Sequence, residues 1–106
     1  MEDELFDQRA ARVVDAPDRE RYELVLGGEV RGYLSYRRHP GIIILIHTEV
    51  DPALQGQGQG SVLAQHALDE ARQRGERVVP RCPFVRRFID EHPEYASLAA
   101  GTSSAG

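Results

Sequence analysis

Residues 42–61 read IIILIHTEVDPALQGQGQGS, and this stretch decides the fold of the chain. Five apolar residues in succession predict a strand over residues 42–50 that is central in a sheet and covered on both faces. Asp51-Pro52 ends this strand, and a glycine-rich loop follows. Over residues 61–74 the apolar residues recur at three- and four-residue spacing, which predicts a helix with one buried stripe. The chain therefore passes from a buried strand through a glycine loop into a helix.

The residues before this stretch predict an antiparallel meander. Residues 22–26 and 30–37 have strand composition, and Gly27-Gly28 between them is typical of a two-residue hairpin turn. Residues 38–41 read RHPG and predict a second turn into the strand over 42–50. An apolar patch at residues 10–14 predicts a further brief strand after a frayed terminus.

The residues after the helix predict a parallel addition to the sheet. Gly75 is a natural helix stop, and residues 77–80 (RVVP) have strand composition. A strand, a helix and another strand in this order favour a parallel crossover. A second helix begins at Pro83 and ends before Pro93. The predicted class is α/β (α+β): a mixed sheet with an antiparallel meander, a parallel strand–helix–strand crossover and a C-terminal helix.

Strict alternation along residues 42–50 predicts two faces. The odd-numbered residues, His47 and Glu49 among them, share one face with the odd-numbered apolar residues before them. The even-numbered residues, Thr48 and Val50 among them, take the other face with the even-numbered isoleucines.

Composition excludes several functional classes. The 106 residues carry 13 Lys and Arg against 17 Asp and Glu, a net charge of −4, which disfavours a nucleic-acid surface. The longest apolar run, residues 42–46, is far too short to cross a membrane, and the acidic N-terminus does not resemble a signal peptide, so a cytoplasmic location is expected. Cys82 is the single cysteine, so neither an internal disulfide nor a metal site of thiolates is expected. We expect one domain over residues 1–98 and a disordered tail over 99–106.

The glycine loop is the most informative motif for function. Glycines let the backbone approach a ligand closely, and the N–H groups at a helix start favour a phosphate or pyrophosphate. The loop fits neither the P-loop nor the dinucleotide fingerprint. A flexible connection between strand and helix is the alternative interpretation. The candidate cofactor-binding residues here are Gln55, Gly56, Gln57, Gly58, Gln59, Gly60 and Ser61.

Four segments together resemble a known family. Residues 55–60 fit the Gln/Arg-x-x-Gly-x-Gly/Ala signature of the GNAT acetyltransferase superfamily. The sequences HTEV at 47–50, VPRCPFV at 79–85 and HPEY at 92–95 resemble its minimal single-domain branch. The resemblance covers residues 21–98.

This resemblance implies an acetyltransferase that uses acetyl-coenzyme A. The loop amides would hold the pyrophosphate, and the pantetheine arm would lie between two splayed strands, pairing with backbone groups near Val50. The acceptor would be a primary amine, of which an exposed protein lysine is one example. Partners are therefore acetyl-coenzyme A and the amine, on a monomer or homodimer without nucleic acid, membrane or metal.

Three side chains are the candidate catalytic residues. Glu49 is the leading general base, because a lysine ammonium must lose its proton before transfer. His47 could share that proton or hold a relay water, and the alternative for both residues is a polar pair at a strand end. Cys82 is a candidate nucleophile at a helix start, or a small buried residue that lines the cofactor site.

One departure from the superfamily favours a second function. Ile89 occupies the position where the resemblance implies a tyrosine that protonates the departing thiolate. Tyr95 is the nearest tyrosine, and it lies beyond Pro93. A non-catalytic acyl-coenzyme A-binding module is therefore the alternative function, and a domain that binds another nucleotide is a third.

Overall fold

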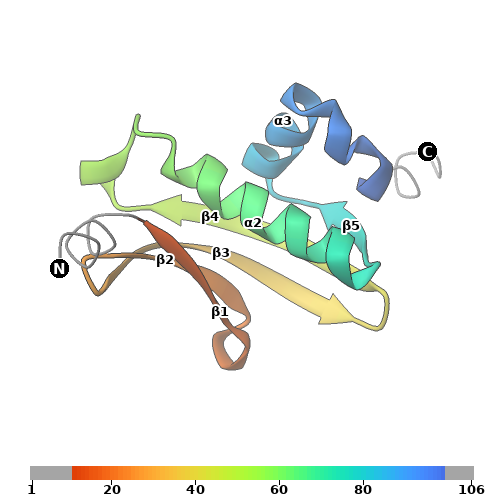
Figure 1. The fold of residues 1–106 in the computed structure, drawn as a ribbon, viewed down its shortest axis with the longest axis horizontal. Coiled ribbons are helices and arrows are strands. Elements are labelled where there is room, and N and C mark those ends of the chain that lie inside the picture. Colours follow the sequence, from red (N-terminus) through yellow and green to blue (C-terminus); the bar gives the residue numbers. More distant parts are fainter. Residues whose placement is uncertain (1–10, 100–106) are drawn as a thin grey trace, which may run out of the picture.

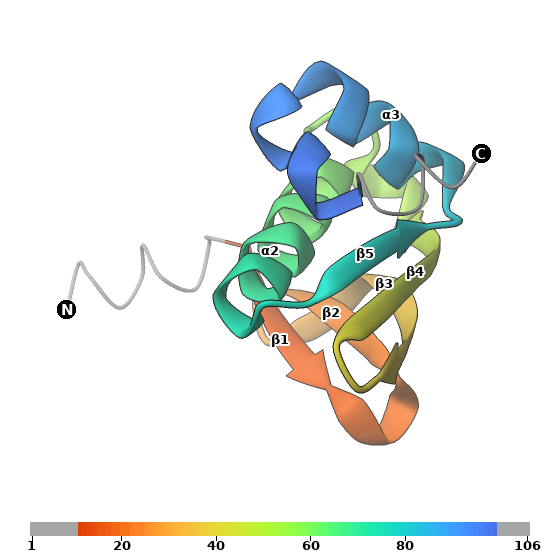
Figure 2. The same cartoon turned by 90° about the vertical axis from the view of Figure 1, so that its right-hand side faces the viewer.

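The computed structural model describes residues 11–99, which form a five-stranded sheet with its helices on one face (Figure 1). The view turned by 90° shows α2 and α3 on the same side of the strands (Figure 2). In chain order the elements are β1 (Arg12–Ala16), η1 (Pro17–Arg19), β2 (Arg21–Leu26), β3 (Glu29–His39), β4 (Ile42–Val50), η2 (Pro52–Leu54), α2 (Gln59–Arg74), β5 (Arg77–Pro80), α3 (Pro83–Glu91) and η3 (Pro93–Tyr95).

The sheet has the predicted topology. Its strand order is β1-β2-β3-β4-β5, with antiparallel pairs from β1 through β4 and a parallel pair between β4 and β5. The antiparallel meander, the parallel crossover and the C-terminal helix are confirmed. Gly27 and Gly28 both have positive φ, 61° and 80°, as a primed hairpin turn requires.

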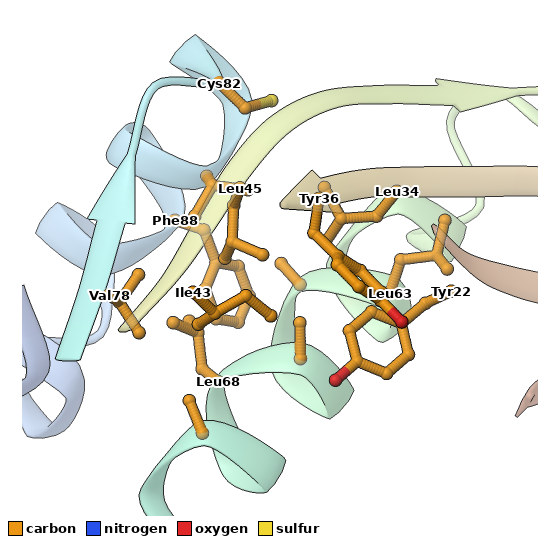
Figure 3. Packing of buried hydrophobic residues seen from close by; sticks show 14 of the residues in the cluster. Tyr22, Leu34, Tyr36, Ile43, Leu45, Leu63, Leu68, Val78, Cys82 and Phe88 are labelled. Atoms are coloured by element: carbon orange, nitrogen blue, oxygen red, sulfur yellow. The ribbon is translucent and has the colours of Figure 1, made fainter. Parts of the chain in front are cut away.

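The core lies between the sheet and the two helices. The stripe of α2 is buried as predicted, and α3 adds a second buried surface (Figure 3). Each of these side chains loses most of its contact with water, and burying an aliphatic side chain fully contributes about 1.5–3 kcal/mol. The buried residues of the helices and strands are Tyr22, Leu24, Leu34, Tyr36, Ile43, Leu45, Leu63, Ala64, Ala67, Leu68, Ala71, Val78, Val85, Phe88 and Ile89.

A β-bulge in β4 reverses the faces of its second half. Ser35 pairs with His47 and Tyr36 pairs with Leu45, so Ile46 has no partner in β3. A bulge residue shifts alternation by one position. The predicted faces of β4 are therefore wrong beyond Ile46. Thr48, which pairs with the buried Leu34, lies on the helix side, whereas His47 and Glu49 lie on the other side.

Coverage of β4 on both faces was also a wrong prediction. The helices lie on one face only, so the other face of β4 has no helix over it, and Ile46 is 39% exposed. We call the sheet surface opposite the helices the open face. The run of five apolar residues therefore combines alternate positions that are buried against the helices with the bulge residue Ile46.

Two further predictions concern the ends of the chain. The strand predicted near residues 10–14 is β1, Arg12–Ala16. The frayed N-terminus and, apart from Ala99, the disordered tail lie outside the described residues. Within residues 11–99, no helix has the length and apolar character needed to cross a membrane.

Candidate functional site

β4 and β5 separate halfway along β4. Their parallel pairing runs only from Ile42 to Leu45, after which β4 continues to Val50. At the point of separation the carbonyl of Leu45 accepts hydrogen bonds from the N–H groups of Arg81 (2.9 Å) and Cys82 (3.0 Å). The chain thus turns away from β4 into α3, and an opening is left beside the second half of β4.

The backbone of β4 presents hydrogen-bonding groups to this opening. The N–H of Asp51 donates to the carbonyl of Arg31 on β3 at 2.8 Å. Because N–H and C=O groups alternate in direction along a strand, those of Val50 and Thr48 point away from β3. These groups line the side that β5 has left, as the free edge of a sheet does.

The glycine loop begins with a capped turn. Asp51 caps η2, and its Oδ1 accepts a hydrogen bond from the N–H of Ala53 at 2.9 Å. Its Oδ2 accepts a second from Nε of Arg31 at 2.8 Å. The Ala53 N–H, and then the Arg31 guanidinium, lower the pKa of Asp51 below its ordinary value. This ion pair holds the end of β4 to β3 and sets the direction in which the loop leaves.

The loop itself depends on left-handed glycines. Gly56 has φ 84° and Gly58 has φ 77°, and Gly58 is the N-cap residue of α2. The first turn of a helix leaves its N–H groups without partners inside the helix, and its dipole is positive there. No acidic residue stands in the first turn of α2. The loop therefore offers unneutralised N–H donors to an anion.

A cleft of about 470 Å³, which we call the helix-side cleft, joins the loop to the opening between the strands. Its walls come from β4, η2, the loop, the start of α2 and α3. The structure brings together all the predicted cofactor-binding residues except Gln57 and Cys82, and adds three that sequence reasoning missed. The lining residues are Thr48, Val50, Leu54, Gln55, Gly56, Gly58, Gln59, Gly60, Ser61 and Phe84.

Close packing of the two helices forms the far wall. A Cβ placed on Gly60 would lie 3.0 Å from Cζ of Phe84, so glycine permits this approach. Oε1 of Gln59 is buried in the same wall and has no hydrogen-bond partner among residues 11–99. This oxygen is therefore free to accept a hydrogen bond from a group outside the described residues.

Cys82 lies immediately behind the cleft. It is the N-cap residue of α3 and only 2% exposed. Its Sγ lies 3.3 Å from Oγ1 of Thr48, which itself lines the cleft. Figure 3 shows Cys82 at the margin of the core, beyond Leu45. Thr48 thus stands between the thiol and the cleft.

Glu49 and His47 form a pair on the open face. Nε2 of His47 lies 3.1 Å from Oε1 of Glu49, and both side chains are more than half exposed. The hydroxyl of Tyr33 on β3 donates to the same oxygen at 3.3 Å. The two candidate catalytic residues therefore share a face as predicted, and Tyr33 is a neighbour that sequence reasoning missed.

A second cleft, of about 340 Å³, opens beside this pair, and we call it the open-face cleft. It lies at the end of β4 on the open face. Val50, the last residue of β4, lines both clefts. The lining residues are Arg21, Val30, Arg31, Gly32, Tyr33, Glu49, Val50, Asp51 and Pro52.

Other groups named by the sequence lie away from both clefts. The hydroxyl of Tyr95 donates to Oδ1 of Asp69 on α2 at 2.7 Å, and burial, followed by this carboxylate, raises the pKa of Tyr95 to about 12. Ile89 is buried in the core. Residues 11–99 contain no group of three or more His, Cys, Asp or Glu side chains that could hold a metal ion.

Comparisons with known proteins agree with this arrangement. Residues 21–98 match the family model of the GCN5-related N-acetyltransferases. A solution structure of a GCN5-like candidate N-acetyltransferase from Staphylococcus aureus is similar to the chain with a TM-score of 0.64 and 19% identity, over 82% of this chain and 85% of that one. The ribosomal-protein-S18-alanine N-acetyltransferase from Escherichia coli is similar with a TM-score of 0.52 and 23% identity, over 74% and 47%. No curated protein shows significant sequence similarity.

Proposed function

The chain belongs to the GCN5-related N-acetyltransferase family, and we propose that it transfers the acetyl group of acetyl-coenzyme A to a primary amine. The observation that carries this proposal is the cleft where the glycine loop meets the opening between β4 and β5. An exposed lysine of a protein is one acceptor of this class, because both clefts are shallow surface features of a small domain.

The residues of the helix-side cleft fit acetyl-coenzyme A. Gly56, Gly58 and the first turn of α2 would hold the pyrophosphate through backbone N–H groups. The apolar side chains of Leu54 and Phe84 would contact the pantetheine arm. Its amides would pair with the free backbone groups of Val50 and Thr48, as an added strand would. The buried Gln59 oxygen would accept a hydrogen bond from the ligand.

Glu49 is the proposed general base. When bound, acetyl-coenzyme A supplies a thioester whose acyl carbon is open to attack by an amine. The amine of a lysine side chain has a pKa of about 10.4 and is an ammonium at physiological pH, so it must lose a proton to attack. Glu49 reaches the open-face cleft at the end where Val50 lines both clefts, and it is placed to accept that proton. His47, 3.1 Å away, shares it.

Direct transfer is the route we propose, with Cys82 as part of the wall behind the cofactor. The thiol is 2% exposed and is hydrogen-bonded to Thr48. The covalent alternative makes Cys82 an acetyl carrier. Mass spectrometry after mixing with acetyl-coenzyme A distinguishes the two routes. An acetyl group on the Cys82 peptide, together with loss of turnover in Cys82→Ala, would establish the covalent route instead.

A non-catalytic acyl-coenzyme A-binding module is the second candidate. The observation that favours it is that, within the described residues, the core-facing side of α3 carries no proton donor; Ile89 is buried there. The hydroxyl of Tyr95, on η3, is held by Asp69. Such a module would bind the cofactor and release no thiol above the uncatalysed rate.

Two measurements test the proposed function in order. Calorimetric titration with acetyl-coenzyme A, against ATP and NAD as controls, is expected to show binding of the coenzyme alone. Thiol release with an amine panel is then expected to show turnover that Glu49→Gln lowers about 100-fold while affinity is retained. Selective binding without turnover would favour the binding module. Absence of binding would reduce the glycine loop to a connection between strand and helix.

A further inference from the structure

The open face holds a buried charge cluster that the proposed reaction does not use. Glu23 is only 5% exposed although it lies on the face that no helix covers. Arg19 and Arg21 cover it, each with Nε 2.9 Å from Oε2 of Glu23. The two arginines lower the pKa of Glu23, with the hydrogen bond from Arg19 as the largest contribution. A charged cluster of this kind orders the surface around it.

The cluster continues into Tyr33. The guanidinium carbon of Arg21 lies 4.7 Å from the centroid of the Tyr33 ring, within the range of a cation–π contact. Glu23 and Tyr33 are also direct partners in the β2–β3 ladder. The ring of Tyr33 is therefore held from one side by an arginine that is itself held by a buried carboxylate.

The Tyr33 hydroxyl ends this chain of contacts at Glu49. It donates to Oε1 of Glu49 at 3.3 Å, and Tyr33 and Glu49 are direct partners in the β3–β4 ladder. The distance exceeds the usual O–H···O value of about 2.7–2.8 Å, and hydrogen bonds of catalytic groups often tighten when substrate binds. The same oxygen also lies 3.1 Å from Nε2 of His47, so Tyr33 and His47 contact one carboxylate oxygen of Glu49.

Charge balance around the open-face cleft singles out Glu49. Arg21 is paired with Glu23 and Arg31 is paired with Asp51, at 2.9 Å and 2.8 Å. Among the charged side chains that line this cleft, and within the described residues, Glu49 is the one paired with neither an arginine nor a carboxylate; it contacts Tyr33 and His47. An ion pair with an arginine would have competed with an incoming cation for this carboxylate.

We propose that Tyr33 is a positioning residue for Glu49. It holds the carboxylate at the mouth of the open-face cleft without neutralising it, and the Arg21–Glu23 pair keeps its ring in place. This inference rests on the proposed function, because it assigns Glu49 the role of base. A hydroxyl that acts only through Glu49 contributes nothing once that carboxylate is gone.

The test is a double-mutant cycle on turnover. Wild type, Tyr33→Phe, Glu49→Gln and the double variant are assayed for kcat, acceptor KM and acetyl-coenzyme A affinity. We expect Tyr33→Phe to lower kcat about fivefold and to change cofactor affinity less than twofold. In the Glu49→Gln background the same substitution is expected to change kcat less than twofold. An equal fivefold loss in both backgrounds would overturn the proposal, because the hydroxyl would then act independently of Glu49.

A matched control separates this effect from general damage. Tyr95→Phe removes a hydroxyl that is hydrogen-bonded to Asp69, far from both clefts. It is expected to lower the free energy of unfolding and leave kcat unchanged. Tyr33→Phe is expected to lower kcat and leave the free energy of unfolding unchanged. A Tyr33→Phe variant that loses stability but keeps kcat would overturn the positioning role. A wild-type protein without turnover would overturn the proposed function itself, and the positioning role with it.

Discussion

The two halves of β4 share one strand and have opposite surroundings. Residues 42–45 pair with strands on both sides, and Ile43 and Leu45 are fully buried. Residues 47–50 pair with β3 alone, and their side chains line two clefts or lie on the open face. The two halves meet at the bulge residue, Ile46.

The difference shows how one strand can serve both fold and site. Loss of the β5 ladder frees the backbone of the second half to bind a ligand, and the bulge reverses which of its side chains face the helices. The first half is stabilised by apolar packing, whereas the end of the second half is held by the Asp51–Arg31 ion pair. The first two experiments below each change one half of β4, and the other two change the segments that follow its second half.

The largest expected effect is on the first half. Leu45→Ala removes a fully buried side chain and leaves a cavity in the core, so we expect a loss of about 3 kcal/mol in the free energy of unfolding. Ile46→Ala, at the bulge, is the control and is expected to cost less than about 1 kcal/mol because that side chain is 39% exposed. Urea unfolding measures both. Equal losses would show that the bulge residue is buried in solution.

The second experiment removes the proposed base from the second half. Glu49→Gln keeps the size of the side chain and both of its neighbours, so stability is expected to change little. We expect kcat to fall about 100-fold, equivalent to about 2.7 kcal/mol, with cofactor affinity unchanged. Steady-state thiol release and calorimetry measure the two quantities. Equal losses in kcat and affinity would instead assign Glu49 a structural role.

The third experiment compares two glycines with similar positive φ angles. Gly58 in the loop has φ 77° and Gly28 in the hairpin has φ 80°. Alanine at either position is strained, so each variant is expected to lose about 1 kcal/mol of stability. Only Gly58→Ala is expected to weaken acetyl-coenzyme A binding, about tenfold, because Gly58 lines the cleft and begins α2. A similar loss of affinity in Gly28→Ala would show that the effect comes from stability alone.

The smallest expected effect depends on pH. Because the pKa of Asp51 is lowered in the folded state, its contribution to stability is present above its ordinary value of 3.8 and is lost as the pH falls below that value. At pH 3 the amides of His47, Glu49 and Asp51, which point toward β3, are therefore expected to lose protection against hydrogen exchange before those of residues 43–45. Asp51→Asn is expected to show the faster exchange already at neutral pH. Uniform exchange along β4 would indicate that the strand opens as one unit.

The elements and their order could be predicted from the sequence because each has a local signal. The turn at Gly27-Gly28 and the apolar stripe of α2 depend on residues close in the chain. The start of α2 was predicted two residues late, at Ser61 instead of Gln59, because glutamine and glycine are weak start signals.

The site could be predicted only in part. The glycine loop is contiguous, so its residues come together as expected. Counting outward from the Pro40-Gly41 turn places Tyr33 opposite Thr48, and only the bulge brings it opposite Glu49. Phe84 reaches the cleft through the packing of two helices, which no local pattern reveals. Pairings beyond a bulge and contacts between helices require the tertiary structure.

The bulge at Ile46 also has a genetic consequence. Deletion of this single codon would remove the one residue of the strand that has no partner in β3, and the pairs Tyr36–Leu45 and Ser35–His47 would become consecutive. His47 and Glu49 would keep the open face, and Thr48 and Val50 would keep the helix side. A base substitution in the same codon changes only a partly exposed side chain. We therefore expect this codon to tolerate both a change of residue and its own deletion.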